Sequence, residues 1–116
     1  MTGFNPEEEN MSVFKKNLES LASVNHLAKL EVLNENNSEV VVSIENKPGK
    51  AGSLAVYHHL NNEFGSMTPE AASAGLELFG EYTEEAKANP GSHPNIAFLF
   101  KVISQGDSYK IKVTEK

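Results

Sequence analysis

The residues of this sequence best suited to chemistry lie in a glycine-rich loop, Pro48 to Leu54, which reads Pro-Gly-Lys-Ala-Gly-Ser-Leu. A strand, such a loop and the first turn of a helix can together present free backbone N–H groups to an anion. The loop is not a Walker motif, because that motif needs Gly where Ile44 stands and Ser or Thr where Ala51 stands. The competing interpretation is an ordinary helix entry, in which glycine permits positive φ and close packing.

A second loop, Asn89 to Asn95, is also rich in proline and glycine and holds a histidine next to Pro94. If both loops lie at the same end of a sheet, their side chains can surround one small polar pocket. The predicted ligand-binding residues are Lys47, Gly49, Lys50, Gly52, Ser53, His58 and His93. The alternative is that both loops are rigid connectors without a ligand.

Histidine is the usual acid or base at neutral pH, because the ordinary pKa of its imidazole is about 6.5. The chain has His26, His58, His59 and His93. His58 and His59 point about 100° apart on a helix, so they cannot chelate one metal as an i, i+4 pair does. We therefore predict no metal site and no cofactor, and no catalytic residue is assigned. His58 is expected to be a hydrogen-bonded residue at the border of an apolar face, and His59 to be solvated.

The composition excludes several classes of function. Sixteen acidic residues stand against ten lysines, with no arginine and no cysteine. Such a chain lacks the usual means of binding phosphates and reading bases, so we predict no nucleic-acid partner, with RNA binding through Lys110 and Lys112 as the alternative. Disulfides, thiolate nucleophiles and cysteine-ligated metals are excluded. The absence of a signal sequence and of a long apolar run predicts a soluble cytoplasmic protein without a membrane partner.

The first half of the chain predicts a helix and a β-hairpin. Residues 1–11 are expected to form a disordered acidic tail, and residues 12–116 a single α+β domain. Apolar residues spaced for a helix follow over 12–23. Apolar and charged side chains alternate over 27–33, and β-branched residues are concentrated over 39–45. These patterns predict two antiparallel strands around a turn. The valine-rich second segment is expected to be the central and most buried strand, because the charges of the others suit exposed edges.

Helices dominate the second half. Ser53 is expected to cap a helix that ends at Gly65 and buries Val56, Tyr57, Leu60 and Phe64 on one face. Thr68 and Pro69 predict the start of one long helix that reaches Ala88, with Phe79 as a core anchor. Gly75 on its apolar face suggests the close approach of another backbone.

The last segments complete the predicted fold. Pro94 to Ile103 favours a helix, although its alternate apolar residues also suit a strand, and Gly106 is a natural stop. Tyr109, Ile111 and Val113 then predict a final strand. The assembled fold is a two-layer α+β domain in the order α-β-β-α-α-α-β, with a three-stranded sheet and about four helices.

Two segments, Ile44–Tyr57 and Pro90–Ile96, resemble a family of short bacterial proteins of unknown function, and the resemblance extends over about residues 12–115. It implies a bacterial cytoplasmic protein and transfers no activity, ligand or catalytic residue. The residues favour a small binding or interaction module whose partner is an unknown protein or a small anionic ligand. The alternative is a small enzyme or anion-binding protein that uses the loops at 46–53 and 89–95.

Overall fold

The computed structural model describes residues 6–116, with side chains from residue 13 onward. The elements follow the order α1-β1-β2-α2-α3-α4-α5-β3. The helices are α1 (Pro6–Glu19), α2 (Ala51–Phe64), α3 (Pro69–Phe79), α4 (Glu81–Ala88) and α5 (Pro94–Gln105). The strands are β1 (Leu27–Asn34), β2 (Val40–Glu45) and β3 (Tyr109–Glu115). The predicted α+β class is confirmed, with five helices in place of about four among the described residues.

The sheet is antiparallel in the order β2-β1-β3, so the predicted hairpin of the first two strands is confirmed. The prediction that the valine-rich strand is central is wrong. It is the edge strand β2, on which Val40 and Val41 are 45% and 40% exposed. The charges on β1 misled the prediction, because Lys29 and Glu31 lie on the open face of the sheet and pair with each other at 3.6 Å. Charges on one wet face do not require a strand to be an edge.

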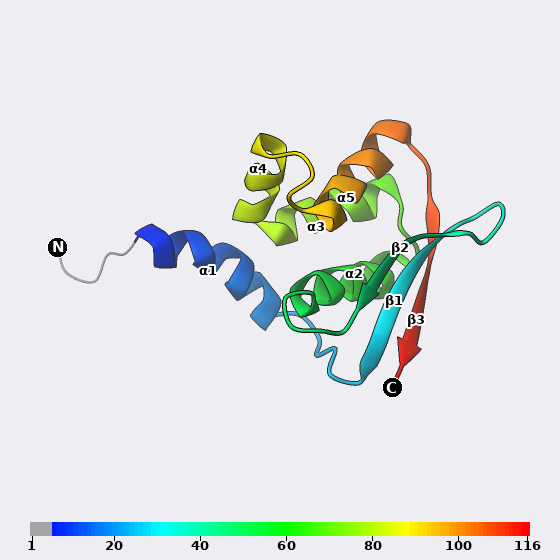
Figure 1. Cartoon of the computed structure of the whole chain (residues 1–116), viewed down its shortest axis with the longest axis horizontal. Coiled ribbons are helices and arrows are strands. Elements are labelled where there is room, and N and C mark those ends of the chain that lie inside the picture. Colours follow the sequence, from blue (N-terminus) through cyan, green and yellow to red (C-terminus); the bar gives the residue numbers. More distant parts are fainter. Residues whose placement is uncertain (1–5) are drawn as a thin grey trace.

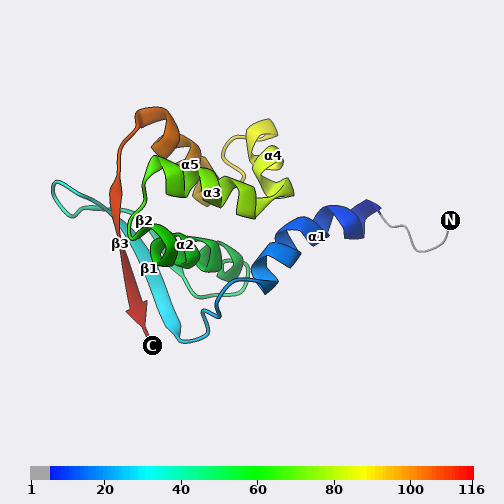
Figure 2. The same ribbon diagram turned by 180° about the vertical axis from the view of Figure 1, so that it is seen from behind.

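The helices all lie on one face of this sheet (Figures 1 and 2). Alternation directs Leu30, Val32 and Ile44 toward that face, where all three are buried. They form one core with Leu54 and Leu60 of α2, which are also buried. The apolar face predicted from alternation in the strands and the apolar face predicted from helical spacing in α2 therefore pack against each other in one interior.

Helix α2 begins earlier than predicted. Lys50 is its N-cap, without a side-chain hydrogen bond, so the prediction that Ser53 caps the helix is wrong. Gly49, with φ +85°, turns the chain just before Lys50, and the helix can start at once. Val56, Tyr57 and Leu60 are buried as predicted, whereas Phe64 is 38% exposed because it ends the helix next to the Gly65 turn. Gly65 stops the helix as predicted, with its N–H donating to the carbonyl of Asn61.

The long helix predicted from Pro69 to Ala88 is two helices. Its start is confirmed, since the Thr68 hydroxyl accepts a hydrogen bond from the Ala71 N–H at 3.1 Å. Phe79 is a core residue as predicted, at 3% exposure. Gly80 then breaks the helix with φ +59° and ψ −125°, a conformation that glycine adopts readily and other residues do not. The break sets α4 at an angle to α3 (Figure 1).

Gly75 lies where three helices meet. An added Cβ would lie 2.9 Å from Cδ1 of Leu60 on α2 and 2.9 Å from Cδ1 of Leu99 on α5. The close approach expected at this glycine is therefore made by two leucine side chains and not by another backbone. Glycine here lets α3 pack tightly between α2 and α5.

The two remaining helices differ in how well they were predicted. α5 is confirmed over the strand alternative, and Gly106 ends it with φ +71°. α1 runs from Pro6 to Glu19 in place of 12–23, so residues 6–11 of the expected disordered tail lie in a helix. Proline and the acidic residues after it favour a helix start at that point. Residues 1–5 lie outside the described residues.

From residue 6 to residue 116, no helix combines the length with the apolar composition that crossing a bilayer requires.

Candidate functional site

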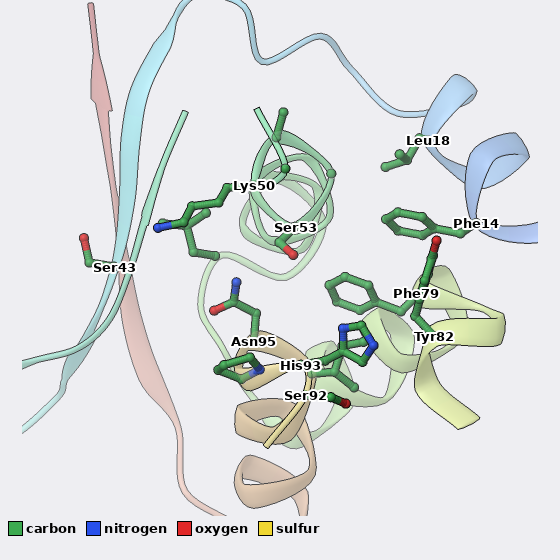
Figure 3. A pocket seen from close by; sticks show the side chains of 16 residues that line it. Phe14, Leu18, Ser43, Lys50, Ser53, Phe79, Tyr82, Ser92, His93 and Asn95 are labelled. Carbon is green, nitrogen blue, oxygen red and sulfur yellow. The ribbon is translucent and has the colours of Figure 1, made fainter. Parts of the chain in front are cut away.

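The two proline- and glycine-containing loops meet at one cleft of about 730 Å³ (Figure 3). One wall comes from Gly49–Ser53, where the first loop enters α2, and another from Ser92–Ile96, where the second loop enters α5. Side chains of α1, α3 and α4 close the cleft. The structure thus brings together segments that are distant in the sequence.

Five of the seven predicted ligand-binding residues line the cleft, namely Gly49, Lys50, Gly52, Ser53 and His93. Lys47 does not line it, because its amine lies 3.4 Å from the carboxylate of Glu45 on the exposed surface. His58 does not line it either. It lies farther along α2, where its ring centroid is 6.1 Å from that of His26.

The first turns of α2 and α5 both face the cleft. The N-cap residues, Lys50 and His93, make no side-chain cap hydrogen bond, in contrast to Thr68 at the start of α3. The first turn of a helix leaves N–H groups without partners inside the helix, and the aligned peptide dipoles make this end positive. At α5 this set is smaller than at α2, because Pro94 has no N–H and the Ile96 N–H donates to the His93 carbonyl at 3.1 Å. Ser53 and Asn95 point toward each other across the cleft, and Lys50 extends on the side nearest the strands (Figure 3).

Aromatic side chains form the opposite wall. The ring of Phe14 stacks on Phe79 at 5.5 Å and meets Tyr82 edge-on at 5.3 Å. Tyr82 in turn lies 5.5 Å from the ring of His93, so the wall continues to the second loop. Phe14 also approaches Gly52, where an added Cβ would be 3.0 Å from its Cζ. The site therefore has a polar end and an apolar end.

Charge is distributed unevenly around this site. The chain has sixteen acidic residues, yet the described residues that line the cleft include none. Lys50 supplies a positive charge to this lining, and His93 supplies an imidazole whose Nε2 lies against Glu85. Such a lining favours an anionic ligand in a chain whose net charge is −6.

Two hydrogen bonds fix the second loop. The buried hydroxyl of Tyr57 donates to the carbonyl of Asn95, and burial raises the pKa of this phenol well above its ordinary range, which keeps it protonated. Nε2 of His93 lies 2.9 Å from a carboxylate oxygen of Glu85. The second loop is thus held in place on one side by Tyr57 of the core and on the other by Glu85 of α4.

Sequence reasoning missed the aromatic wall and Asn95. Phe14 lies within the apolar spacing over 12–23 and Tyr82 within the long helix predicted to reach Ala88, but such local patterns do not reveal which side of the core the two residues border. The one available signal was Gly52, since a glycine in the first turn of a helix permits a close neighbour. That signal does not identify Phe14 as the neighbour.

His58, outside the cleft, has an unusual environment. Its Nδ1 is buried without a hydrogen-bond partner among the described residues, while its Nε2 lies 3.3 Å from the Asn62 amide nitrogen. Burial lowers the pKa of this imidazole below 6.5, and repulsion from His26 and His59 lowers it further. The folded protein therefore favours the neutral form of His58.

We expect this histidine to make stability depend on pH. Below pH 6.5 the unfolded chain protonates His58 before the folded protein does, so the free energy of unfolding falls as pH decreases toward the lowered pKa. The variant His58→Gln, which stays neutral in both states, should lose less stability between about pH 8 and pH 5. Urea unfolding midpoints measure the difference. His59→Gln is the control and should keep most of the pH dependence, whereas an equal loss in wild type and His58→Gln would contradict this account.

Among the described residues, no group of three or more His, Asp or Glu side chains is placed to hold a metal ion.

Comparison with protein families gives one result. The model of a family described as "Uncharacterized protein conserved in bacteria (DUF2322)" matches residues 14–113. Comparison with curated proteins and with solved structures gave no match.

Proposed function

The chain belongs to the bacterial protein family DUF2322, and we propose that it is a small binding module whose cleft takes a small organic anion with an apolar, ring-like body. The observation that carries this proposal is the meeting of two uncapped helix starts and Lys50 at a cleft whose described lining has no acidic residue. A volume of about 730 Å³ suits a ligand of this size.

The anionic group of the ligand would lie at the start of α2. The backbone N–H groups of Gly52 and Ser53 occupy the first helical turn, and Lys50 precedes them. A carboxylate or phosphate there would gain charge-assisted hydrogen bonds from the amides and attraction from the ammonium group. Ser53 and Asn95, which face each other, would orient the group (Figure 3).

The apolar body of the ligand would contact the aromatic wall. The planes of the Phe14 and Tyr82 rings lie at 86° to each other. Aromatic groups pack well in such offset and edge-to-face arrangements. A ligand with a ring close to its acidic group would reach both ends of the cleft.

A second function, proton transfer by His93, is favoured by the contact between its Nε2 and Glu85. A carboxylate that orients an imidazole is part of many acid–base sites. The nearest serine on the same loop, Ser92, donates its hydroxyl to the carbonyl of Asn89 at 2.7 Å and so is not activated by His93. Binding without chemistry therefore remains the better supported function.

Replacement of Lys50 tests the proposal. We expect Lys50→Gln to weaken the binding of phenylacetate and phenyl phosphate about tenfold, since one charge-assisted contact contributes about 1.5 kcal/mol. The binding of neutral phenethyl alcohol should not change. Isothermal titration calorimetry measures the three affinities.

Lys47→Gln is the matched control, because Lys47 lies near Lys50 in sequence but pairs with Glu45 outside the cleft. It should leave all three affinities unchanged. Equal effects of the two substitutions would attribute the anion preference to general electrostatics and contradict a site at Lys50. Failure of both acids to bind the wild type would remove the proposal.

A further inference from the structure

A second groove, of about 540 Å³, continues from the cleft along the free edge of β2. It shares Ser43, Pro94 and Asn95 with the cleft, so the two hollows meet. The groove is also lined by Val41, Val42, Gly91, Ala97, Phe98 and Lys101. A linear ligand can therefore extend from the cleft into the groove.

The edge of β2 offers backbone groups along this path. The N–H of Asn46 donates to the carbonyl of Ala28 on β1 at 2.9 Å. In an antiparallel pair, backbone groups alternate in direction, so those of Ile44 also face β1 while both groups of Ser43 and the N–H of Glu45 face the open edge. The Glu45 carbonyl already accepts a hydrogen bond from the Lys47 N–H at 3.0 Å. The register shifts opposite Val32, where β2 holds an extra residue, and this bulge limits the regular edge to residues 42–45.

Apart from Ser43 and Asn95, which it shares with the cleft, the groove is lined by apolar residues and one cation. Val42, Ala97 and Phe98 supply apolar surface, and Lys101 supplies a positive charge. As in the cleft, the described lining residues include no acid. A strand that is added to an edge gains main-chain hydrogen bonds, and pockets for its alternate side chains give specificity.

From these features we infer that the ligand is the C-terminal end of an extended peptide, which pairs with β2 as a short fourth strand. The inference rests on the proposed function, since the terminal carboxylate is the anion held at Lys50 and the start of α2. The last side chain contacts the aromatic wall, an earlier one enters the groove beside Phe98, and an acidic residue of the peptide faces Lys101. Three or four residues fill the regular edge.

A second copy of this chain is a poorer occupant of the same edge. Each copy has a net charge of −6, and Glu39 and Glu45 flank the strand. Pairing of two such edges would bring two net negative charges together, which is unfavourable. Dimerisation in sedimentation experiments without peptide, abolished by Ser43→Pro, would overturn the inference in favour of a second copy.

The test compares peptides with the single amino acid at their end. The probes are acetyl-phenylalanine and a pool of acetylated tetrapeptides that end in phenylalanine, carry a free carboxylate and vary at the other three positions. We expect the best tetrapeptides to bind at least tenfold more tightly than acetyl-phenylalanine and to lose most of this affinity when the C-terminus is amidated. Equal affinity of acetyl-phenylalanine and every tetrapeptide would overturn the inference while the proposed function stands. Failure of acetyl-phenylalanine itself to bind would count against the proposed function.

Two variants locate the added strand. Ser43→Pro removes an N–H from the open edge, where proline is tolerated, and the Ser43 side chain points away from the cleft (Figure 3). It should abolish the extra affinity of the tetrapeptide over acetyl-phenylalanine, whose binding to the same variant is measured alongside. Lys101→Gln should reduce the extra affinity of tetrapeptides that contain an acidic residue and should not affect the others. If the tetrapeptides still bind more tightly than acetyl-phenylalanine after both substitutions, the peptide binds elsewhere.

Hydrogen exchange gives a readout that does not depend on the folding of a variant. In the wild type, the Ser43 and Glu45 amides should exchange more slowly when the tetrapeptide is bound, because they would donate to it. Acetyl-phenylalanine should not slow them. Unchanged exchange at both amides with saturating tetrapeptide would overturn the inference.

Discussion

Replacement of Phe79 by alanine is expected to lower the free energy of unfolding by about 3–5 kcal/mol. Phe79 is 3% exposed at the end of α3, and its ring stacks on Phe14 of α1 at 5.5 Å. Truncation removes buried apolar surface and leaves a cavity that the neighbouring helices cannot fill completely. It also removes the support of the aromatic wall. Urea unfolding followed by circular dichroism measures the loss.

Phe64→Ala is the matched control for this prediction. The side chain is the same, but Phe64 is 38% exposed at the end of α2. Its truncation should cost no more than about 1.5 kcal/mol, because much of the ring already contacts water. Similar losses for the two substitutions would contradict the assignment of Phe79 to the core and of Phe64 to its border.

Gly80→Ala is expected to destabilise the protein by about 2–4 kcal/mol, from two separate causes. The φ of +59° and ψ of −125° at the α3–α4 break strain any residue with a side chain. In addition, an added Cβ would lie 2.7 Å from Cγ1 of Val13, so α1 would have to move. Because α1 carries Phe14, the substitution should also weaken phenylacetate binding at the cleft.

Two further variants separate the causes. Gly65 has φ +79° with no atom near an added Cβ, so Gly65→Ala reports the backbone cost alone and should lose only about 1–2 kcal/mol. Val13→Ala in the Gly80→Ala background should recover the part of the lost free energy of unfolding that is due to the contact with α1. If Gly80→Ala costs no more than Gly65→Ala, α1 does not pack against the break as described.

Local signals predicted most of the elements. The hydroxyl of Thr68, the fixed φ of Pro94 and the positive φ of Gly65 and Gly106 act within one helical turn, so the sequence reveals them directly. Alternation identified β1 and β3, because one face of the sheet is buried and the other is wet, and a run of β-branched residues identified β2. These features do not depend on distant parts of the chain.

Features that depend on distant contacts were not predictable. β2 is an edge because β3, from the other end of the chain, pairs with the free side of β1. Gly80 resembles a tolerated glycine on a helical face until α1 is placed against it. In a similar way, Lys47 appeared equivalent to Lys50, and only the fold assigns one to Glu45 and the other to the cleft.

The two loops of the candidate site could be predicted from the sequence, but the aromatic wall of the cleft could not. Proline and glycine mark both loops in the sequence, but their meeting requires the whole helical layer. The aromatic wall requires contacts among α1, α3 and α4, each from a different segment. A ligand site that contains both a charge and an aromatic wall was therefore not foreseen.

The central claim is that the cleft between the two loops binds an anion with a ring, and NMR titration with phenylacetate tests it most directly. The account predicts saturable shifts of the Gly52, Ser53 and Asn95 amides, together with nuclear Overhauser contacts from the ligand ring to Phe14 and Tyr82. Unmoved amides at these three positions, or shifts centred on His26 and His58 instead, would contradict it.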